Sequence, residues 1–250
     1  MAVPTVSVVL PALDEAAGIV EAIDDAEVAL DDLKNRAVIG DYEILVIDDG
    51  STDDTGRLAE ARAAGRDRVR VLSHRVNRGV GAGLRTAMVA SRCTLVLYTD
   101  ADMPVDLRAM ESAIPVLGRP GVGMVAGQRS EWRRGGGLRG AASKAYDVLA
   151  RVVLGVHERD VNFPFKLLDR EVALGLHLRS DGALIDVEML ARVKQVGLAV
   201  EQVTLDYRPR AHGESKTMTT RLLRRLAWEL ARNGASIRRA AAGPRDQPGG

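Results

Sequence analysis

The sequence contains a single cysteine, Cys93, which excludes an intramolecular disulfide and fits a reducing compartment. Its 35 basic and 34 acidic residues give a net charge of +1, so the overall charge indicates no nucleic-acid partner. No apolar run approaches the ~20 residues that span a membrane. The first residues, Met-Ala-Val-Pro-Thr, lack the basic start of a signal peptide. These absences predict a cytoplasmic protein, either soluble or bound peripherally to a membrane.

Several sequence signatures of catalysis are also missing. There is no Walker A motif, which excludes ATP hydrolysis of the P-loop type, and no G-x-S-x-G nucleophile elbow. The glycines of segment 79–83 do not form a dinucleotide-binding motif, because Leu84 stands where the third glycine is needed. The four histidines are scattered without metal-ligand spacing. We interpret these glycines as sites of close helix–sheet packing and the histidines as ordinary surface or hydrogen-bonded residues.

What the sequence does contain is a regular alternation of short apolar runs and helical patterns. Apolar runs typical of buried parallel strands lie at 6–10, 43–47, 69–72, 94–99 and 122–127. Helical spacing occurs between them, at 16–33, 52–64, 80–91 and 105–117. This alternation predicts an α/β protein with a mostly parallel central sheet and helices on both faces.

The alternation ends after Gly127. The pattern then predicts a helix, a strand, a helix and a last strand, at 138–154, 161–168, 186–196 and 200–205. A polar loop precedes a basic amphipathic helix over 217–239, and the tail 240–250 is expected to be disordered. A chain of 250 residues suits one main domain, 1–216, with the basic helix as an appendage.

Acidic residues follow two of the predicted strands at the point where each strand ends. Asp48 and Asp49 follow the second strand, and Asp100 and Asp102 follow the fourth. Taken alone, either pair suits a turn or a helix cap. The two pairs together indicate one crevice at the carboxyl edge of an open α/β sheet. A hard cation such as Mg²⁺ needs only one or two protein carboxylates when phosphates supply further ligands, so we predict a nucleotide–metal site.

The polar loop near the C-terminus is a second candidate. Arg210, Ser215 and Lys216 offer guanidinium, hydroxyl and ammonium donors around Gly213. Such donors are suited to binding a diphosphate. A solvated basic loop is the equal alternative for this segment.

Seven short motifs, in this order, resemble the inverting family two glycosyltransferases. They are VVLPALDE at 8–15, IDDGSTD at 47–53, NRG at 77–79, DAD at 100–102, GQR at 127–129, FK at 165–166 and R-x-x-G-x-S-K at 210–216. The most similar branch is that of the dolichyl-phosphate or polyprenyl-phosphate sugar synthases. The resemblance covers about residues 5–216. It implies a GT-A fold, a nucleotide-sugar donor such as a GDP- or UDP-hexose, and a Mg²⁺ or Mn²⁺ ion.

The resemblance also implies roles for individual residues. The nucleoside pocket would be lined by Pro11, Asp14, Glu15 and Asp48, with Asp49 and Gly50 nearby. Contacts to metal, ribose or diphosphate would come from Asp100 and Asp102. The phosphates and the acceptor would be surrounded by Arg129, Lys166, Arg210, Ser215 and Lys216.

From these roles we expect direct displacement at the anomeric carbon of the donor. The metal and Arg210 stabilise charge on the leaving nucleoside diphosphate, while Arg129 and Lys166 hold the acceptor. A polyprenyl phosphate is already anionic near neutral pH and needs no strong base. A hydroxyl acceptor needs one, and Asp186 or Glu188 is the candidate. Either residue is equally consistent with a plain acid in the first turn of a helix.

Two other reactions remain open. One is glycosyl transfer to a soluble or polysaccharide hydroxyl. The other is sugar nucleotidyl transfer, which also uses an α/β sheet and paired acids. That reaction expects a Gly-rich basic signature after the first strand, where this chain has the acidic segment 11–15.

The predicted C-terminal helix bears on the acceptor. Its leucines recur at helical spacing among arginines, with Trp228 nearby. This pattern is typical of a helix in a membrane interface, or equally of a helix packed on its own domain. With a polyprenyl phosphate acceptor we expect a peripheral enzyme at the inner face of the cell membrane, or one docked on a separate membrane partner.

Overall fold

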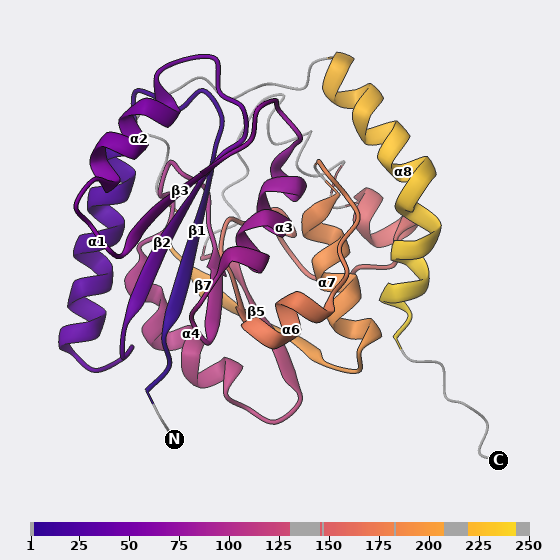
Figure 1. The fold of residues 1–250 in the computed structure, drawn as a ribbon. Helices are drawn as coiled ribbons and strands as arrows, with labels where there is room; N and C mark the ends of the chain where they lie inside the picture. Colours follow the sequence, from indigo (N-terminus) through magenta and orange to yellow (C-terminus); the bar gives the residue numbers. More distant parts are fainter. Residues whose placement is uncertain (1–2, 131–145, 147, 183, 208–219, 244–250) are drawn as a thin grey trace.

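A computed structural model describes residues 3–130, 146, 148–182, 184–207 and 220–243. A seven-stranded sheet forms its centre, in the order β3-β2-β1-β4-β6-β5-β7 (Figure 1). The strands are β1 Val6–Ala12, β2 Tyr42–Asp48, β3 Val69–Ser73, β4 Leu95–Tyr98, β5 Val122–Arg129, β6 Lys166–Asp169 and β7 Ala199–Leu205. All are parallel except β6, which runs antiparallel between β4 and β5. The predicted mostly parallel α/β sheet is therefore confirmed.

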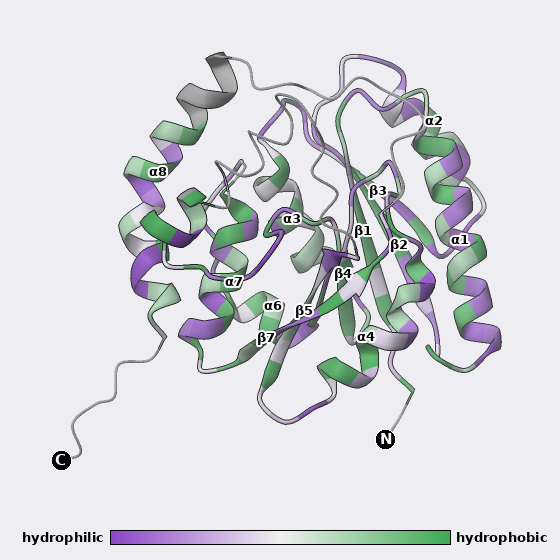
Figure 2. Ribbon diagram, turned by 180° about the vertical axis from the view of Figure 1, so that it is seen from behind, coloured by the Kyte–Doolittle hydropathy of each residue, from purple (hydrophilic) through white to green (hydrophobic). Residues whose placement is uncertain are grey.

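Helices cover both faces of the sheet. They are α1 Ile19–Asn35, α2 Thr55–Ala63, α3 Val80–Ala90, α4 Met110–Leu117, α6 Arg170–Gly175, α7 Ile185–Gln195 and α8 Thr220–Ala241. In β1, Val8 and Leu10 pack into the core beneath α1 and α4, whereas Val9 packs into the core beneath α3 and α7. Burial on both faces explains the continuous apolar runs. Figure 2 shows the contrast between the largely hydrophobic strands and the outer helices, which are striped.

The predicted strand over 161–168 is wrong at its start, since β6 begins only at Lys166. The preceding segment turns at Asp160, where φ is 49° and the carbonyl accepts the N–H of Phe163 at 2.8 Å. Pro164 has no N–H for a sheet ladder. The apolar residues here are buried, but in a turn. Most of the predicted helix 138–154 lies outside the described residues, and within them Leu149–Val153 forms a π-helical turn.

The C-terminal helix packs on the domain. Leu226 and Leu230 are partly buried against the core beneath α7, and Ile237 and Ala240 are fully buried there. The helix ends at Ala241, whereas the sequence predicts an end near Arg239 and a disordered tail from residue 240. Trp228 remains 53% exposed, with the Arg232 guanidinium 4.9 Å from its ring centroid. In the described part of the chain, every helix is too short or too polar to cross a membrane.

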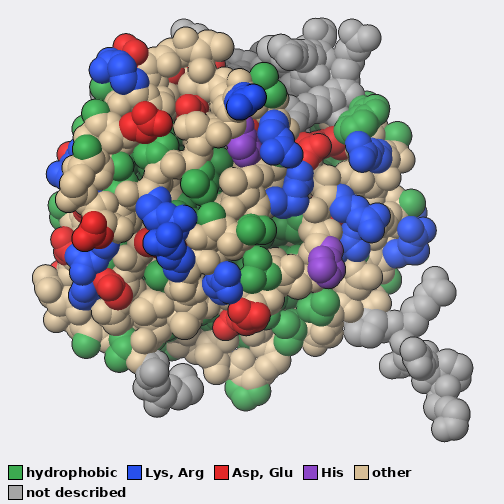
Figure 3. All heavy atoms as spheres, viewed as in Figure 1, with side chains coloured by type: hydrophobic (Ala, Val, Ile, Leu, Met, Phe, Trp, Pro, Cys, Tyr) green, Lys and Arg blue, Asp and Glu red, His purple; other side chains and the backbone are tan. Residues whose placement is uncertain are grey.

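Charge is unevenly spread over the surface. On the face shown in Figure 3, basic side chains predominate on the side of α6 and α8, whereas acidic side chains are more frequent towards α1 and α2. This agrees with the acid-rich N-terminal part and the arginine-rich C-terminal part of the sequence. The net charge of +1 is therefore the sum of an acid-rich and an arginine-rich part of the chain.

Candidate active site

The ends of five strands meet at one edge of the sheet. Ala12 at the end of β1 lies opposite Asp48 at the end of β2, and Val9 lies opposite Tyr98 of β4. Tyr98 in turn pairs with Lys166, the first residue of antiparallel β6. Because Lys166 also pairs with Ala126 of β5, this edge gathers residues from both halves of the chain. The strand order reverses between β1 and β4, and such a switch point forms the ligand crevice of open α/β sheets.

On the β1–β2 side, the loops after these two strands are joined by hydrogen bonds. The backbone N–H of Asp14 donates to Ser51 Oγ at 3.0 Å, and Thr52 N–H donates to Asp14 Oδ1 at 2.8 Å. Glu15 N–H donates to Thr55 Oγ1 at 2.8 Å. The two predicted nucleoside residues Asp14 and Glu15 are therefore held in a preformed pair of loops.

Asp53 strengthens the same connection. Its carboxylate accepts the N–H of Ala16 at 3.2 Å and both the N–H and the hydroxyl of Thr55. Burial alone would raise the pKa of the Asp53 carboxyl, but the hydrogen bonds from Thr55 and Ala16 outweigh it and lower that pKa. The carboxylate is thus favoured in its charged form, in which it can accept all these donors.

The turn after β2 requires glycine at position 50. Gly50 has a φ of +74°, and a Cβ there would lie 2.5 Å from the carbonyl carbon of Val76. Just before it, Asp48 is buried and accepts the N–H of Ser51 at 3.0 Å. The turn is therefore pressed against the loop that leads into α3.

Asp49 points into that neighbouring loop. It is 4% exposed, and its carboxylate accepts the N–H groups of Arg78 at 3.0 Å and Gly79 at 2.6 Å. His74 Nδ1 lies 2.7 Å from the same carboxylate, and His74 Nε2 lies 3.0 Å from Thr86 Oγ1. Asp49 thus orders the β3–α3 loop, and His74 is a hydrogen-bonded histidine, as predicted.

The loop after β4 carries Asp100 and Asp102. Its base is fixed because the buried Thr99 hydroxyl donates to the carbonyl of Pro164 at 2.8 Å. Both carboxylate oxygens of Asp102 are shielded from solvent. Among the described residues, no three acidic, histidine or cysteine side chains form a metal-binding group. Two carboxylates in one loop fit Mg²⁺ or Mn²⁺, because such ions take their remaining ligands from phosphates and water.

Beside this loop lies a buried network of ionisable groups. The Nζ of Lys166 lies 2.6 Å from Asp186 Oδ1, donates to the carbonyl of Phe163 at 2.8 Å and lies 5.6 Å from the Tyr98 ring centroid. Complete burial raises the pKa of Tyr98, and the charges of Asp186 and Asp100 raise it further. The sequence-based expectation that Lys166 holds the acceptor needs correction: Lys166 is 1% exposed and is committed to Asp186 and Phe163.

Arg129 at the end of β5 belongs to a second cluster. Its Nε lies 3.3 Å from Oδ2 of Asp160, and its guanidinium lies 4.6 Å from the ring centroid of Tyr207. Its side chain is 36% exposed, so part of the guanidinium still faces solvent. Neither Asp160 nor Tyr207 lies in a predicted motif, and the only sequence signal for Asp160 is its place before the apolar segment that turns.

Glu188 does not fit the role of a catalytic base. It is fully buried, and its Oε2 accepts the N–H groups of Arg179 at 3.0 Å and Ser180 at 2.7 Å. Its Oε1 lies 3.2 Å from the Arg192 guanidinium. With both oxygens bound to protein donors, we retain only Asp186 as a candidate base. Arg210, Ser215 and Lys216 lie outside the described residues.

Known proteins resemble the chain in sequence. Glycosyltransferase AglD of Haloferax volcanii is 29% identical over 232 residues, which cover 91% of this chain and 36% of that protein. Dolichyl-phosphate beta-glucosyltransferase of Dictyostelium discoideum is 25% identical over 214 residues, or 80% of this chain and 65% of that protein. The chain thus spans about a third of the first relative and slightly less than two thirds of the second.

Solved structures share the fold. Mannosyl-3-phosphoglycerate synthase from Rubrobacter xylanophilus has a TM-score of 0.64 and 26% identity, with 93% of this chain and 75% of that chain covered. Glucosyl-3-phosphoglycerate synthase from Mycobacterium tuberculosis, in complex with phosphoglyceric acid, has a TM-score of 0.61 and 25% identity. The match covers 98% of this chain and 82% of that chain. A mannosyltransferase from Pyrobaculum calidifontis, solved with GDP-Man and Mn²⁺, matches in fold with a TM-score of 0.61 and 18% identity. The match covers 96% of this chain and 73% of that chain.

These neighbours confirm the predicted GT-A fold. The family model described as "Glycosyl transferase family 2" matches residues 7–183, which include β1 to β6 and both acidic loops. This match covers well over half of the 250 residues. The chain therefore belongs to glycosyl transferase family 2.

Proposed function

We propose that this enzyme transfers a hexose from a nucleoside-diphosphate donor to a polyprenyl phosphate, with inversion at the anomeric carbon. The observation that carries the proposal is the division of one sheet edge. Acidic loops follow β1, β2 and β4, while Arg129 and the Lys166–Asp186 pair lie at the ends of β5 and β6. A donor with a metal and an anionic acceptor then have separate places on that edge.

On the donor side, the proposed nucleoside contacts are Pro11, Asp14, Glu15 and Asp48. Asp49 and Gly50 support them by ordering the turn after β2. Asp100 and Asp102 would hold Mg²⁺ or Mn²⁺, which when bound neutralises charge on the diphosphate. Among the structural neighbours, the Pyrobaculum enzyme was solved with a nucleotide sugar and Mn²⁺. We assign Arg210, Ser215 and Lys216 to the leaving diphosphate as donors.

On the acceptor side, Arg129 is the proposed phosphate-binding group. Its guanidinium stacks on Tyr207, and Asp160 fixes its Nε. A planar fork held in this way suits a phosphate. A polyprenyl phosphate supplies an oxygen that is already anionic, so the reaction needs no strong base. The relative from Dictyostelium, named as a dolichyl-phosphate glucosyltransferase, supports this acceptor class.

A phosphorylated hydroxyl acceptor is the second candidate. The synthases from Rubrobacter and Mycobacterium are named for products built on 3-phosphoglycerate. Such an acceptor offers a phosphate for Arg129 and a hydroxyl that must lose its proton. Asp186, whose side chain is 14% exposed, is the proposed acceptor of that proton. The family assignment leaves sugar nucleotidyl transfer without support.

The deciding experiment is a matrix of donors and acceptors. GDP-mannose, GDP-glucose, UDP-glucose and UDP-galactose are each combined with a polyprenyl phosphate and with 3-phosphoglycerate, in Mg²⁺ and in Mn²⁺. We expect nucleoside diphosphate and a glycosylated polyprenyl phosphate. Efficient transfer to 3-phosphoglycerate alone would overturn the lipid assignment, and release of pyrophosphate would overturn glycosyl transfer itself.

Binding of the protein to a membrane surface needs a separate experiment. The exposed Trp228 and Arg232 on α8 support a peripheral contact, although Leu226 and Leu230 are used in packing on the domain. We expect the chain to co-sediment with anionic vesicles at low salt and less at high salt, because arginines contribute roughly 1 kcal/mol each near such a surface. Trp228→Ala should weaken this binding. Equal recovery with neutral and anionic vesicles would contradict the contact.

A further inference from the structure

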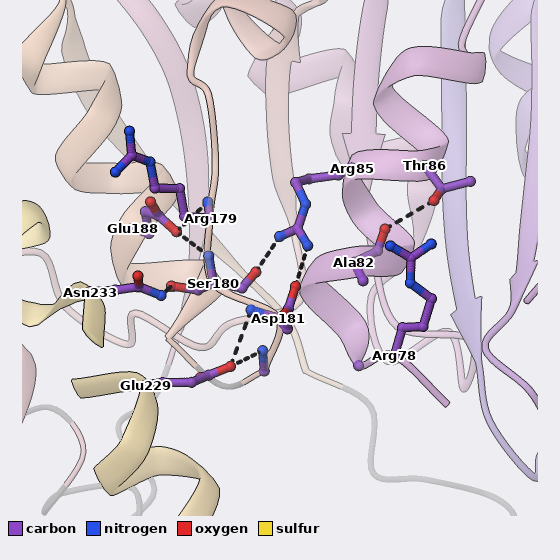
Figure 4. A network of polar contacts seen from close by, with 12 residues as sticks. Arg78, Ala82, Arg85, Thr86, Arg179, Ser180, Asp181, Glu188, Glu229 and Asn233 are labelled. Atoms are coloured by element: carbon purple, nitrogen blue, oxygen red, sulfur yellow. Dashed lines mark hydrogen bonds and ion pairs between the residues drawn. The ribbon is translucent and has the colours of Figure 1, made fainter. Parts of the chain in front are cut away.

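The loop that joins α6 to α7 is held from the C-terminal helix (Figure 4). Glu229 of α8 is 1% exposed, and its carboxylate reaches three backbone N–H groups of this loop. It accepts from Asp181 at 3.1 Å, from Gly182 through a short bond and from Leu184 at 3.4 Å. One turn later on α8, Asn233 donates to the Ser180 hydroxyl at 3.3 Å.

The other side of the loop rests on α3. Arg85 donates to the carbonyl of Ser180 at 2.5 Å and forms an ion pair with Asp181. The N–H of Gly81 donates to the carbonyl of Asp181 at 2.9 Å. A Cβ at Gly81 would overlap the carbonyl oxygen of Ser180, so the loop lies directly on the α3 backbone. The loop is therefore pinned between α3 and α8.

Helix α7 begins at the end of this loop. Its N-cap residue, Leu184, provides no capping side chain, and the N–H of Ile185, the first residue of the helix, donates to the carbonyl of Gly182 at 3.1 Å. The carboxylate of Glu229 accepts the N–H of this N-cap residue at 3.4 Å from another helix, and its negative charge suits the positive end of the α7 dipole. Glu229 therefore binds the segment from which α7 starts.

Asp186 lies two residues after Leu184, in the first turn of α7. Its Oδ1 lies 2.6 Å from the Nζ of Lys166, at the proposed acceptor side of the site. A shift of the α7 start would move Asp186 relative to Lys166. The loops after β1 and β2, which we assign to the donor, are bonded to each other and not to α8 in the interactions described above.

We propose that Glu229 is a positioning residue for the acceptor half of the active site: from α8 it binds the loop and the N-cap residue that precede α7, and thereby holds Asp186 beside Lys166. This inference rests on the proposed function for its kinetic part. It also makes α8 a component of the catalytic unit, although the family match ends at residue 183. A merely structural Glu229 would lower stability and reduce all activities of the folded fraction alike.

The kinetic test compares Glu229→Ala, Glu229→Gln and the control Ala235→Ser, at an exposed position of α8. With 3-phosphoglycerate as acceptor, whose hydroxyl must lose its proton to Asp186, we expect Glu229→Ala to lower kcat by about 10- to 100-fold, the range for small misplacement of a reacting group. With a polyprenyl phosphate, which needs no base, most of the activity should remain. The donor KM and the calorimetric Kd for donor with Mn²⁺ should stay within about twofold, on the same argument. Glu229→Gln keeps an oxygen for the N–H groups of Asp181 and Gly182 and should recover part of kcat. Ala235→Ser should match the wild type.

With the hydroxyl acceptor, three kinetic outcomes would overturn the inference: unchanged kcat in Glu229→Ala, equal loss in kcat and donor affinity, or no recovery in Glu229→Gln. For an enzyme that glycosylates only a polyprenyl phosphate, amide hydrogen exchange decides instead. Arg85→Gln, which loosens the same loop from α3, gives an independent variant if Glu229→Ala does not fold. It should reproduce the fall in kcat with donor affinity retained. Normal kcat in a folded Arg85→Gln enzyme would also count against the proposal.

Amide hydrogen exchange separates this proposal from the proposed function. In the wild-type chain without substrate, we expect slow exchange at Asp181, Gly182 and Leu184, and faster exchange in Glu229→Ala that extends to Asp186. If the wild type transfers sugar to no acceptor of the matrix, the proposed function fails, while faster exchange as far as Asp186 still supports the positioning role. If exchange in Glu229→Ala is faster only at residues 181–184 and is unchanged at Asp186, the positioning role is overturned.

Discussion

The ammonium group of Lys166 lies 2.6 Å from Oδ1 of Asp186, although the two residues come from β6 and α7. Lys166 is 1% exposed and Asp186 is 14% exposed, so each charge depends on the other for compensation. Removal of one partner of such a pair costs about 3–5 kcal/mol, because the remaining charge stays buried. The pair therefore couples the stability of the fold to the acceptor side of the site.

This coupling predicts the result of a double-mutant cycle. Lys166→Met should lower the free energy of unfolding by about 3 kcal/mol. This is the lower end of the range for a broken buried pair, because Asp186 retains some exposure. Lys166→Met combined with Asp186→Asn should be more stable than Lys166→Met alone, since no uncompensated charge remains. Urea unfolding of the single and double variants measures both values. If the two mutations simply add, the pair does not contribute through its charges.

Asp186→Asn distinguishes the two acceptor classes. With a hydroxyl acceptor, loss of a general base should reduce kcat by about 10²- to 10⁴-fold. With a polyprenyl phosphate, whose oxygen is already anionic, most of the activity should remain. The measurement is kcat for both acceptors at constant donor and metal. Loss of activity with the phosphate acceptor, at unchanged acceptor affinity, would contradict a reaction that needs no base.

Asp102→Ala tests the metal site. We expect turnover to be abolished and metal-dependent donor binding to weaken, because a ligand carboxylate is lost. The fold should survive, since the residue lies in a loop after β4 and outside the hydrophobic core. Asp106→Ala, four residues on, removes a carboxylate that accepts the N–H of Arg108 and should leave metal dependence intact. Full activity of Asp102→Ala in EDTA-treated buffer would refute the metal hypothesis.

The sequence predicted the parallel half of the fold well for a physical reason. Strands buried on both faces must be continuously apolar, and parallel strands have their carboxyl ends at one edge, so Asp48 and Asp100 follow β2 and β4 on either side of β1. The antiparallel β6 breaks this rule. Its position depends on the turn at Asp160 and on pairing with two strands, which no local pattern reveals.

Contacts between distant segments limited the prediction of the site. The spacing of Asp186 and Glu188 gave no way to tell that one carboxylate faces Lys166 while the other binds the backbone of residues 179 and 180. Glu229 lies on a helix whose pattern indicated only amphipathicity. Its partners are more than 40 residues away in the chain, so its positioning role is visible only in the folded structure.

Gly50→Ala should weaken donor binding by distorting the turn after β2. Alanine at a φ of +74° is strained, and its Cβ would lie 2.5 Å from the Val76 backbone, so we expect a loss of about 1–3 kcal/mol in unfolding free energy. Gly65→Ala is a matched control, because Gly65 has a φ of +73° but nothing within 4 Å of a Cβ. It should show the strain without the loss of donor affinity. Equal donor affinity in both variants would contradict the role of this turn.

Asp53→Asn should show a pH-dependent loss of stability. The pKa of the folded-state carboxyl is lowered, so its contribution to stability is present above the unfolded pKa of ~3.9 and is lost as the pH falls through the lower folded value. The stability difference between wild type and Asp53→Asn should therefore be complete at pH 7 and shrink below about pH 4. Urea unfolding over this range measures it.

Asp54→Asn separates stability from donor binding. Its carboxyl pKa is also lowered, through a hydrogen bond and charge attraction from Arg57 on the same helix. Both variants should therefore lose their stability difference from wild type in acid. Only Asp53 also bonds the loop after β1, at the N–H of Ala16, so only Asp53→Asn should weaken donor binding at pH 7. Equal donor affinities for the two variants would mean that the link between the loops does not shape the donor pocket.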